Sequence, residues 1–295
     1  MARWGDLARR GLVALVGAPA MVLGARDGVV MERLPPFESR LLGENRTIDV
    51  FLPRGYRDND TATYPVLYAN DGQDMEAVDL RGTLDSLQRT GRMAPVIVVA
   101  IHATERVQDY GTAYLPNAQG LGARADRYDK FLLTELMTLI EARYRVATGA
   151  EHTAIMGWSL GGLSAFDIAW RHPDRFRTVG VFSGSFWWRT DDGSTEAKQT
   201  SRIMHRRVKE TPGHPRLRMW FETGSQDEQA DRDQDGVIDA IQDTEELVAI
   251  LERKGYRRGL DMVHLTIEGR HDLPTWKRLL PEFLTWAFPP ETRAD

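Results

Sequence analysis

One stretch constrains the fold of this chain more than any other: residues 154–162, which read Ala-Ile-Met-Gly-Trp-Ser-Leu-Gly-Gly. Three apolar residues lead into a Gly-x-Ser-x-Gly turn, and a helical pattern starts directly after it. This order is typical of a strand that reverses sharply into a helix. Gly157 and Gly161 suit such a turn, because the two backbones approach too closely for a Cβ atom. Ser159 is then exposed at the apex, where the first N–H groups of the helix favour negative charge. The stretch predicts that Ser159 is a nucleophile.

Length and composition set broad limits on the remaining possibilities. The chain has 295 residues, enough for one large α/β domain or two small ones. With 38 Lys and Arg against 43 Asp and Glu, the net charge is −5, so no overall basic field attracts nucleic acid. The absence of cysteine excludes disulfides, thiol catalysis and cysteine-ligated zinc. These limits favour an ordinary globular enzyme.

The N-terminus carries a possible targeting signal. Basic residues precede an apolar run over 11–25 that is too short to span a bilayer, and Leu23-Gly24-Ala25 could serve as a cleavage site. Asp6 and Pro19 interrupt this pattern, and an N-terminal helix packed on the domain is the alternative. We therefore expect residues 1–33 to form a separate N-terminal segment. The pattern leans slightly towards export, and no stable membrane span is expected.

Apolar strands alternate with amphipathic helices through residues 34–295. This alternation predicts a single three-layer α/β domain, a mostly parallel sheet with helices on both faces. The run 95–101 is apolar throughout, as in a covered central strand, whereas 46–53 alternates like a half-exposed antiparallel strand. Further strands are expected at 64–69, 154–158, 178–183, 217–223 and 263–268, and helices at 75–87, 125–145, after Ser159, at 238–254 and at 274–288. A polar insertion is expected at 189–215.

A nucleophilic serine needs a base, and the base needs an acid that orients it. In a fold of this kind the chain order is serine, acid, histidine. His271 follows the last predicted strand in a loop, at the edge of the sheet where the serine is expected, and is therefore the predicted base. Asp227 follows the preceding strand and is the predicted acid, with Glu222 and Glu228 as alternatives.

Two backbone N–H groups are needed to stabilise an oxyanion. We expect them at Leu160, directly after the nucleophile, and at Gln73, in an Asp-Gly-Gln turn that follows an earlier strand. That turn could equally be an ordinary reverse turn. The candidate substrate contacts are aromatic residues next to predicted strand ends: Trp158, Trp187 and Trp188.

A second motif lies in the loop at 231–239, which reads Asp-Arg-Asp-Gln-Asp-Gly-Val-Ile-Asp. It resembles the first part of an EF-hand calcium loop, and it predicts a structural Ca²⁺ whose ligands are Asp231, Asp233, Asp235, Val237 and Asp239. Gln242 stands where the usual bidentate glutamate would be, and no helix is expected upstream. The alternative is an acidic helix N-terminus, which the helix dipole favours without a metal.

Three strings together resemble the putative-esterase (enterochelin esterase-like) branch of the α/β-hydrolase superfamily: 157–165, 172–176 (His-Pro-Asp-Arg-Phe) and 183–188 (Ser-Gly-Ser-Phe-Trp-Trp). The resemblance covers roughly 46–288. It implies carboxylic ester hydrolysis by Ser159, His271 and Asp227, with no cofactor for catalysis, on a small-molecule, aryl or siderophore-like ester. We expect no counterpart of the N-terminal β-domain of enterochelin esterases here, and the calcium-like loop is not general in the branch.

Two other functions remain open from the sequence. The same three residues could pass an acyl group to an alcohol other than water, as mycolyl transferases of this branch do. A non-catalytic, calcium-dependent scaffold is the third possibility, although such proteins usually lose the serine or the histidine. A serine esterase is the leading hypothesis.

Overall fold

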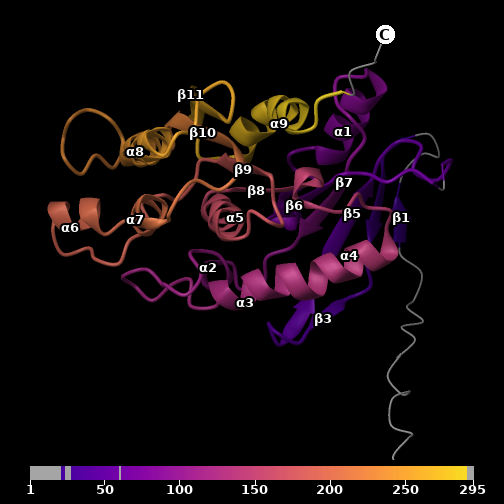
Figure 1. The fold of residues 1–295 in the computed structure, drawn as a ribbon, viewed down its shortest axis with the longest axis horizontal. Coiled ribbons are helices and arrows are strands. Elements are labelled where there is room, and N and C mark those ends of the chain that lie inside the picture. The colour runs from indigo at the N-terminus through magenta and orange to yellow at the C-terminus, as the bar shows by residue number, and fades with distance from the viewer. Residues whose placement is uncertain (1–20, 24–27, 60, 291–295) are drawn as a thin grey trace, which may run out of the picture.

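A nine-stranded sheet runs through the middle of the molecule in the computed structural model, which describes residues 21–23, 28–59 and 61–290 (Figure 1). In spatial order its strands are β1 (Met21–Leu23), β2 (Val30–Arg33), β5 (Ile48–Leu52), β7 (Ile97–Ile101), β6 (Val66–Asn70), β8 (Thr153–Trp158), β9 (Thr178–Phe182), β10 (Arg218–Gln226) and β11 (Met262–Arg270). The six strands from β7 to β11 are mutually parallel, and β1, β2 and β5 pair antiparallel at the other end. The expected mostly parallel sheet is confirmed.

Helices cover both faces of this sheet. On one face α1 (Leu80–Arg89) packs beside α9 (Leu273–Ala287), and their apolar residues share one core with the sheet. On the other face lie α5 (Leu160–Arg171), α7 (Ile203–Glu210), α8 (Asp239–Arg253) and a long helix composed of α3 (Ala125–Lys130), a π-helical stretch (Phe131–Leu136) and α4 (Met137–Arg143) (Figure 1). The central strands β6, β7, β8 and β9 are buried throughout, as two covered faces require.

The antiparallel end of the sheet differs from the sequence-based expectation. Strand β5 is fully buried rather than half-exposed. Its polar residue Asp49 is 4% exposed because Arg33 and His102 pair with its carboxylate, at 2.7 and 2.8 Å. Strand β2 lies within the predicted N-terminal segment, so the sheet begins before residue 34. The apolar run and cleavage site expected at 11–25 fall mostly outside the described residues.

Shorter elements complete the fold. A hairpin of β3 (Phe37–Ser39) and β4 (Glu44–Arg46) stands apart from the main sheet, and α2 (Arg106–Asp109) precedes the long helix. The predicted polar insertion contains α6 (Thr195–Thr200) as well as α7. Within the described part of the chain, no helix has both the length and the apolar character needed to cross a membrane.

Candidate active site

Ser159 lies at the junction of β8 and α5 with backbone angles φ 55° and ψ −126°. A positive φ is unfavourable for a residue with a side chain, so the surrounding backbone must hold this conformation. The N–H of Ser159 donates to the Phe182 carbonyl at 2.8 Å, and its own carbonyl accepts from the N–H of Ser185 at 3.2 Å. A methyl group on Gly157 would lie only 2.4 Å from the carbonyl carbon of Gly161. The predicted strand–turn–helix is present, and it presents the serine hydroxyl at the sheet edge.

The hydroxyl opens into a cavity of about 280 Å³ at the carboxyl ends of the parallel strands. Residues from the segments following β8, β9, β10 and β11 line this cavity: Ser159, Ser183, Gly184, Ser185, Trp187, Asp227, Glu228, Ala240 and His271. Parallel strands end at the same edge of a sheet, and this brings residues that are far apart in sequence to one place. The structure thus gathers the predicted nucleophile, base and acid around one cavity.

The imidazole of His271 faces the carboxylate of Asp227, with Nδ1 3.8 Å from Oδ2. That separation is an ion-pair contact but is too long for a hydrogen bond. The Asp227 side chain is 1% exposed, and its Oδ2 accepts the N–H of Gly224 at 3.1 Å. The His271 ring packs edge-on against Trp276, with the ring centres 5.2 Å apart. A small movement of the imidazole would complete the hydrogen bond, and such tightening is common when a substrate binds.

Within the described residues, the hydrogen-bond partner of Ser159 Oγ is Ser185 Oγ, at 3.5 Å. The hydroxyl is therefore not yet bonded to the imidazole of His271. The side chain of His271 is 37% exposed, so solvent reaches the ring. These positions describe an open site in which serine and histidine share a cavity but have not closed onto one another.

The two predicted oxyanion donors lie on either side of the elbow. Leu160 is the first residue of α5, and N–H groups in the first turn of a helix have no partner within that helix. Gln73 lies in a single 3₁₀ turn, Gly72–Asp74, directly after β6. A methyl group on Gly72 would lie 2.8 Å from the carbonyl carbon of Ala100, so the turn packs tightly against β7.

Arg106 ties this turn to the elbow. Its guanidinium forms two hydrogen bonds to the buried carboxylate of Asp71, at 2.8 and 2.9 Å, and a third to the carbonyl of Trp158, at 3.3 Å. Asp71 itself has φ 58°, another strained position. The Gln73 side chain bridges Asp71 and the N–H of Ala103, each at 3.0 Å. These contacts fix the two candidate donors relative to the nucleophile. The carboxylate is bound by two parallel N–H groups of one guanidinium, a geometry that requires arginine.

Comparison with known proteins identifies the family of this chain. The family model described as "Putative esterase" matches residues 39–287. The chain belongs to this esterase family. Among curated relatives, an esterase of Mycobacterium tuberculosis is 30% identical over 53% of this chain and 33% of its own length. The iron(III) enterobactin esterase of Escherichia coli K12 is 31% identical over 38% of this chain and 26% of its own length.

Solved structures of two esterases share the fold of this chain. A ferulic acid esterase superposes with a TM-score of 0.67 at 21% identity, covering 88% of this chain and 97% of its own. The enterobactin esterase of Shigella flexneri, solved in the presence of enterobactin, gives 0.68 at 21% identity, covering 93% of this chain and 60% of its own. The matched stretches cover 58% of the first curated relative and about a third of the next two.

The predicted tryptophan contacts need correction in this family member. Trp158 is 2% exposed, stacks on Trp276 with ring centres 5.5 Å apart, and donates from Nε1 to Asp74 at 3.0 Å. Trp188 is 1% exposed and packs against the backbone beyond α2. Both belong to the core: Trp158 packs in the core on the α1 and α9 face of the sheet, and Trp188 in the core on the other face. Trp187 lies on the cavity wall with Ser159.

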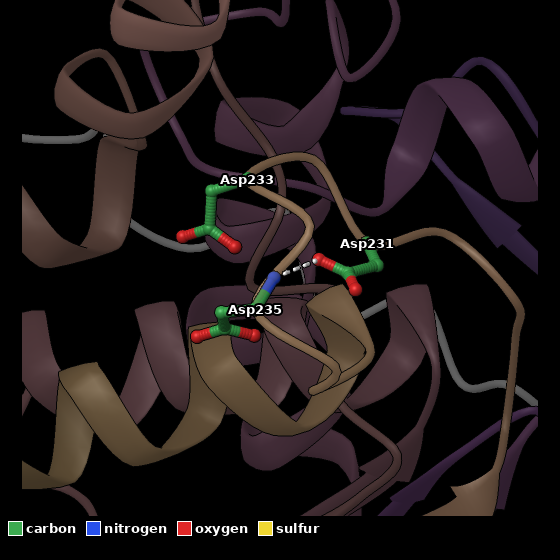
Figure 2. Close-up of side chains that lie close together, drawn as sticks. All are labelled: Asp231, Asp233 and Asp235. Carbon is green, nitrogen blue, oxygen red and sulfur yellow. Dashed lines mark hydrogen bonds between the residues drawn. The ribbon is translucent and has the colours of Figure 1, made fainter.

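The aspartate loop before α8 gathers three carboxylates (Figure 2). Asp231, Asp233 and Asp235 each place a carboxylate oxygen within 4.8 Å of the others. The Asp231 carboxylate accepts the N–H of Asp235 at 3.2 Å and that of Gly236 at 2.9 Å. Asp239 was expected in this cluster but lies outside it, because its carboxylate pairs with Arg232 at 3.2 Å. Of the five predicted ligands, three aspartates lie close together, Asp239 lies in an ion pair, and the Val237 carbonyl stays a prediction.

Other residues of the site were not recognised from the sequence. Ser183 and Ser185 line the cavity after β9, and the strand-end rule that located Asp227 and His271 could have found them. Glu228 was weighed only as the orienting acid, yet it is part of the wall. Arg106 carries no local signal, because its partner lies 35 residues away in the chain.

The cavity is acidic. Its lining includes the carboxyl groups of Asp227 and Glu228 and no Lys or Arg side chain of the described residues. Burial and the nearby charge of Asp239 raise the pKa of Glu228, so this carboxyl resists ionisation more than a free one.

Proposed function

We propose that this protein hydrolyses carboxylic esters through an acyl-enzyme on Ser159. The observation that carries the proposal is the shared cavity, which is lined by a serine on a strained elbow together with His271 and Asp227. Family membership over residues 39–287 supports the same reaction class. The two curated relatives named above match 53% and 38% of this chain, and they leave its substrate open.

In the proposed mechanism, Ser159 Oγ attacks the ester carbonyl while His271 accepts its proton. Asp227 holds the imidazole in the tautomer that can accept at Nε2, and it stabilises the imidazolium. The N–H groups of Leu160 and Gln73 stabilise the oxyanion of the tetrahedral intermediate. His271 then protonates the departing alcohol. Water, activated by the same imidazole, releases the acid and restores the serine.

The proposed substrate is a small ester with an uncharged aryl or short acyl group. Trp187 offers an aromatic surface beside the nucleophile, and the acidic cavity disfavours anionic groups. The curated relatives include an endo-1,4-beta-xylanase/feruloyl esterase of Xylanibacter ruminicola, 27% identical over 50% of this chain and 21% of its own length. We therefore infer a feruloyl-type ester ahead of an anionic siderophore.

The test compares turnover of methyl ferulate and p-nitrophenyl acetate by the wild type, Ser159→Ala and Ser86→Ala. Ser86 is an exposed serine on α1, far along the chain from the elbow, and serves as the control. We expect Ser159→Ala to lose at least about 10³-fold in kcat, as removal of a nucleophile does, and Ser86→Ala to match the wild type. Wild-type kcat in Ser159→Ala would contradict the proposal. Adding an acceptor alcohol and analysing products distinguishes hydrolysis from acyl transfer.

We also propose a structural Ca²⁺ at Asp231, Asp233 and Asp235. Three carboxylates supply part of the six to eight oxygens that Ca²⁺ takes, and the loop carbonyls and water would supply the rest. Two of the three side chains are exposed, so the ion would act on the loop rather than on the reaction. The loop begins four residues after Asp227, and ordering it would restrain that acid.

Thermal unfolding tests the calcium proposal. At about 100 times the Kd, Ca²⁺ should raise the unfolding midpoint by several degrees, roughly 3–6 °C. The rise should be abolished in Asp233→Asn and kept in Asp174→Asn, an exposed acid in another loop. Equal midpoints in Ca²⁺ and EDTA, or an equal rise with Mg²⁺, would rule out a calcium site.

A further inference from the structure

A second carboxyl group lies buried behind the candidate acid and has no role in the mechanism above. Glu222 lies on β10, between β9 and β11, and is 0% exposed. Neither of its carboxyl oxygens has a hydrogen-bond partner among the described residues. A buried polar group without a partner is costly, so this glutamate calls for a physical explanation.

Strand geometry places the Glu222 side chain on the same face of the sheet as the Asp227 carboxylate. Side chains alternate along a strand, so Glu222 and Gly224 face the same side of the sheet. A methyl group on Gly224 would lie 2.5 Å from Asp227 Oδ1, so the Asp227 carboxylate occupies the space that a side chain at 224 would fill. The residue between them, Thr223, bonds to Thr244 of α8 on the opposite side. Glu222 therefore extends along the face on which the Asp227 carboxylate lies.

The carboxyl groups of Glu222 and Asp227 both have buried oxygens without a hydrogen-bond partner among the residues that the structure describes, and each could be the partner of the other. Asp227 Oδ1 is buried and has no partner in the described structure, although Oδ2 accepts the N–H of Gly224. An ionised carboxylate only accepts hydrogen bonds, whereas a protonated carboxyl also donates one. A proton held on Glu222 would therefore give Asp227 Oδ1 its missing donor.

The charges around Glu222 favour that protonated form. Burial, and then the negative charge of Asp227, raise the pKa of Glu222 to about 8, and Arg278 of α9 and the nearby N–H of Ser183 oppose them in part. That N–H donates to the backbone carbonyl of Glu222 at 2.7 Å, so it is already engaged. The neighbouring β9 end contributes Ser183, which is uncharged and accepts a hydrogen bond from Trp276 at 2.9 Å. On the α8 side, Thr223 and Thr244 are also neutral.

We propose that Glu222 is a positioning residue whose protonated carboxyl group donates a hydrogen bond to Asp227 and so orients the carboxylate that holds His271. This inference depends on the proposed role of Asp227 in ester hydrolysis. Loss of the proton at alkaline pH removes the donor and puts a second negative charge against the first. The geometry of the base is then disturbed, and kcat falls while substrate contacts at the cavity wall stay the same.

Two variants separate hydrogen bonding from packing. Glu222→Gln keeps a donor of the same shape but cannot ionise, and Glu222→Leu has a similar volume and no donor. Glu282→Gln, an exposed glutamate on α9, is the matched control. For each protein, kcat and KM for p-nitrophenyl acetate are measured from pH 6 to pH 10.

We expect Glu222→Gln to keep near-wild-type kcat at pH 7 and to lose the alkaline decline that the wild type and Glu282→Gln show. Glu222→Leu should lose roughly 10-fold or more in kcat with KM unchanged, the effect of removing a hydrogen bond to a charged group. An alkaline decline unchanged in Glu222→Gln would overturn the proposal, as would wild-type kcat in folded Glu222→Leu. If Glu222→Leu does not fold, the profile of Glu222→Gln decides alone. Failure of the esterase proposal itself would appear instead as activity in Ser159→Ala.

Discussion

Ser159 combines a strained backbone with a hydroxyl that is not yet engaged by its base. Hydrogen bonds from the Ser159 backbone to Phe182 and Ser185 hold this strained backbone conformation. The imidazole of His271 lies 3.8 Å from Asp227, beyond hydrogen-bonding distance, and packs edge-on against Trp276. We therefore expect the imidazole to close onto Ser159 and Asp227 when a substrate binds.

At the same scale, the buried carboxylate of Asp49 makes a pH-dependent contribution to stability. Burial opposes ionisation, but hydrogen bonds from Arg33 and His102 prevail and lower the pKa of Asp49 to about 2. A depressed pKa stabilises the folded state above the pKa of the unfolded chain, near 4. This contribution is lost as the pH falls from about 4 to about 2.

The prediction concerns Asp49→Asn and its free energy of unfolding in urea. At pH 7 the variant should be less stable than the wild type by about 2 kcal/mol, and the difference should shrink steadily between pH 4 and pH 2. Asp174→Asn, an exposed aspartate, should show no such trend. A difference that does not change with pH would mean that lost packing, and not the ion pair, destabilises the variant.

At the scale of elements, the elbow depends on glycines that allow β8 and α5 to approach. Gly157→Ala would place a methyl group 2.4 Å from the Gly161 backbone, which cannot move without shifting α5. We expect a loss of roughly 3 kcal/mol or more in unfolding free energy, with loss of esterase activity.

Gly193→Ala is the matched control, because the sole close neighbour of the added methyl group is the flexible, exposed side chain of Asp191, at 3.1 Å. Chemical unfolding and turnover of p-nitrophenyl acetate measure both effects. A Gly157→Ala variant with wild-type stability and kcat would show that the elbow tolerates separation of strand and helix.

The sequence predicted the long apolar and amphipathic elements well and the short or polar ones poorly. The continuously apolar run 95–101 indicated a covered strand, and the Gly-x-Ser-x-Gly motif at Ser159 indicated a sharp strand-to-helix turn. The short strand β2 and the hairpin of β3 and β4 have too few residues to show an alternation of apolar and polar side chains. The burial of β5 depends on the distant partners of Asp49, which no local pattern reveals.

The same contrast holds at the site. Ser159, Asp227 and His271 could be located because each follows a predicted strand, and parallel strands end at one edge. Trp158 and Trp188 were misplaced because the direction of a side chain at a strand end depends on the exact turn. Asp239 was misplaced because Arg232, its partner, is itself held by Asp243 of α8, at 2.6 Å. Pairwise contacts across the fold decided each of these positions.

At the scale of the whole molecule, the two ends of the sheet have different roles. The parallel strands β8, β9, β10 and β11 deliver the cavity residues to one edge, while the antiparallel strands complete the core. The turn after β6 holds Gln73, the proposed second oxyanion donor, and Arg106 links this turn to the elbow. The arrangement leaves the loops beyond the strand ends as the part of the chain in which the cavity wall can vary without changing the sheet.

The most direct test of the esterase proposal is covalent labelling of the intact protein with a fluorophosphonate, followed by intact-mass and peptide mass spectrometry. An activated serine reacts with such a reagent, whereas an ordinary buried or surface serine does not. We predict a single stoichiometric adduct on the peptide containing Ser159, absent in Ser159→Ala and slowed in His271→Ala. An unlabelled wild-type protein, or an adduct that persists in Ser159→Ala, would contradict the assignment of Ser159 as the nucleophile.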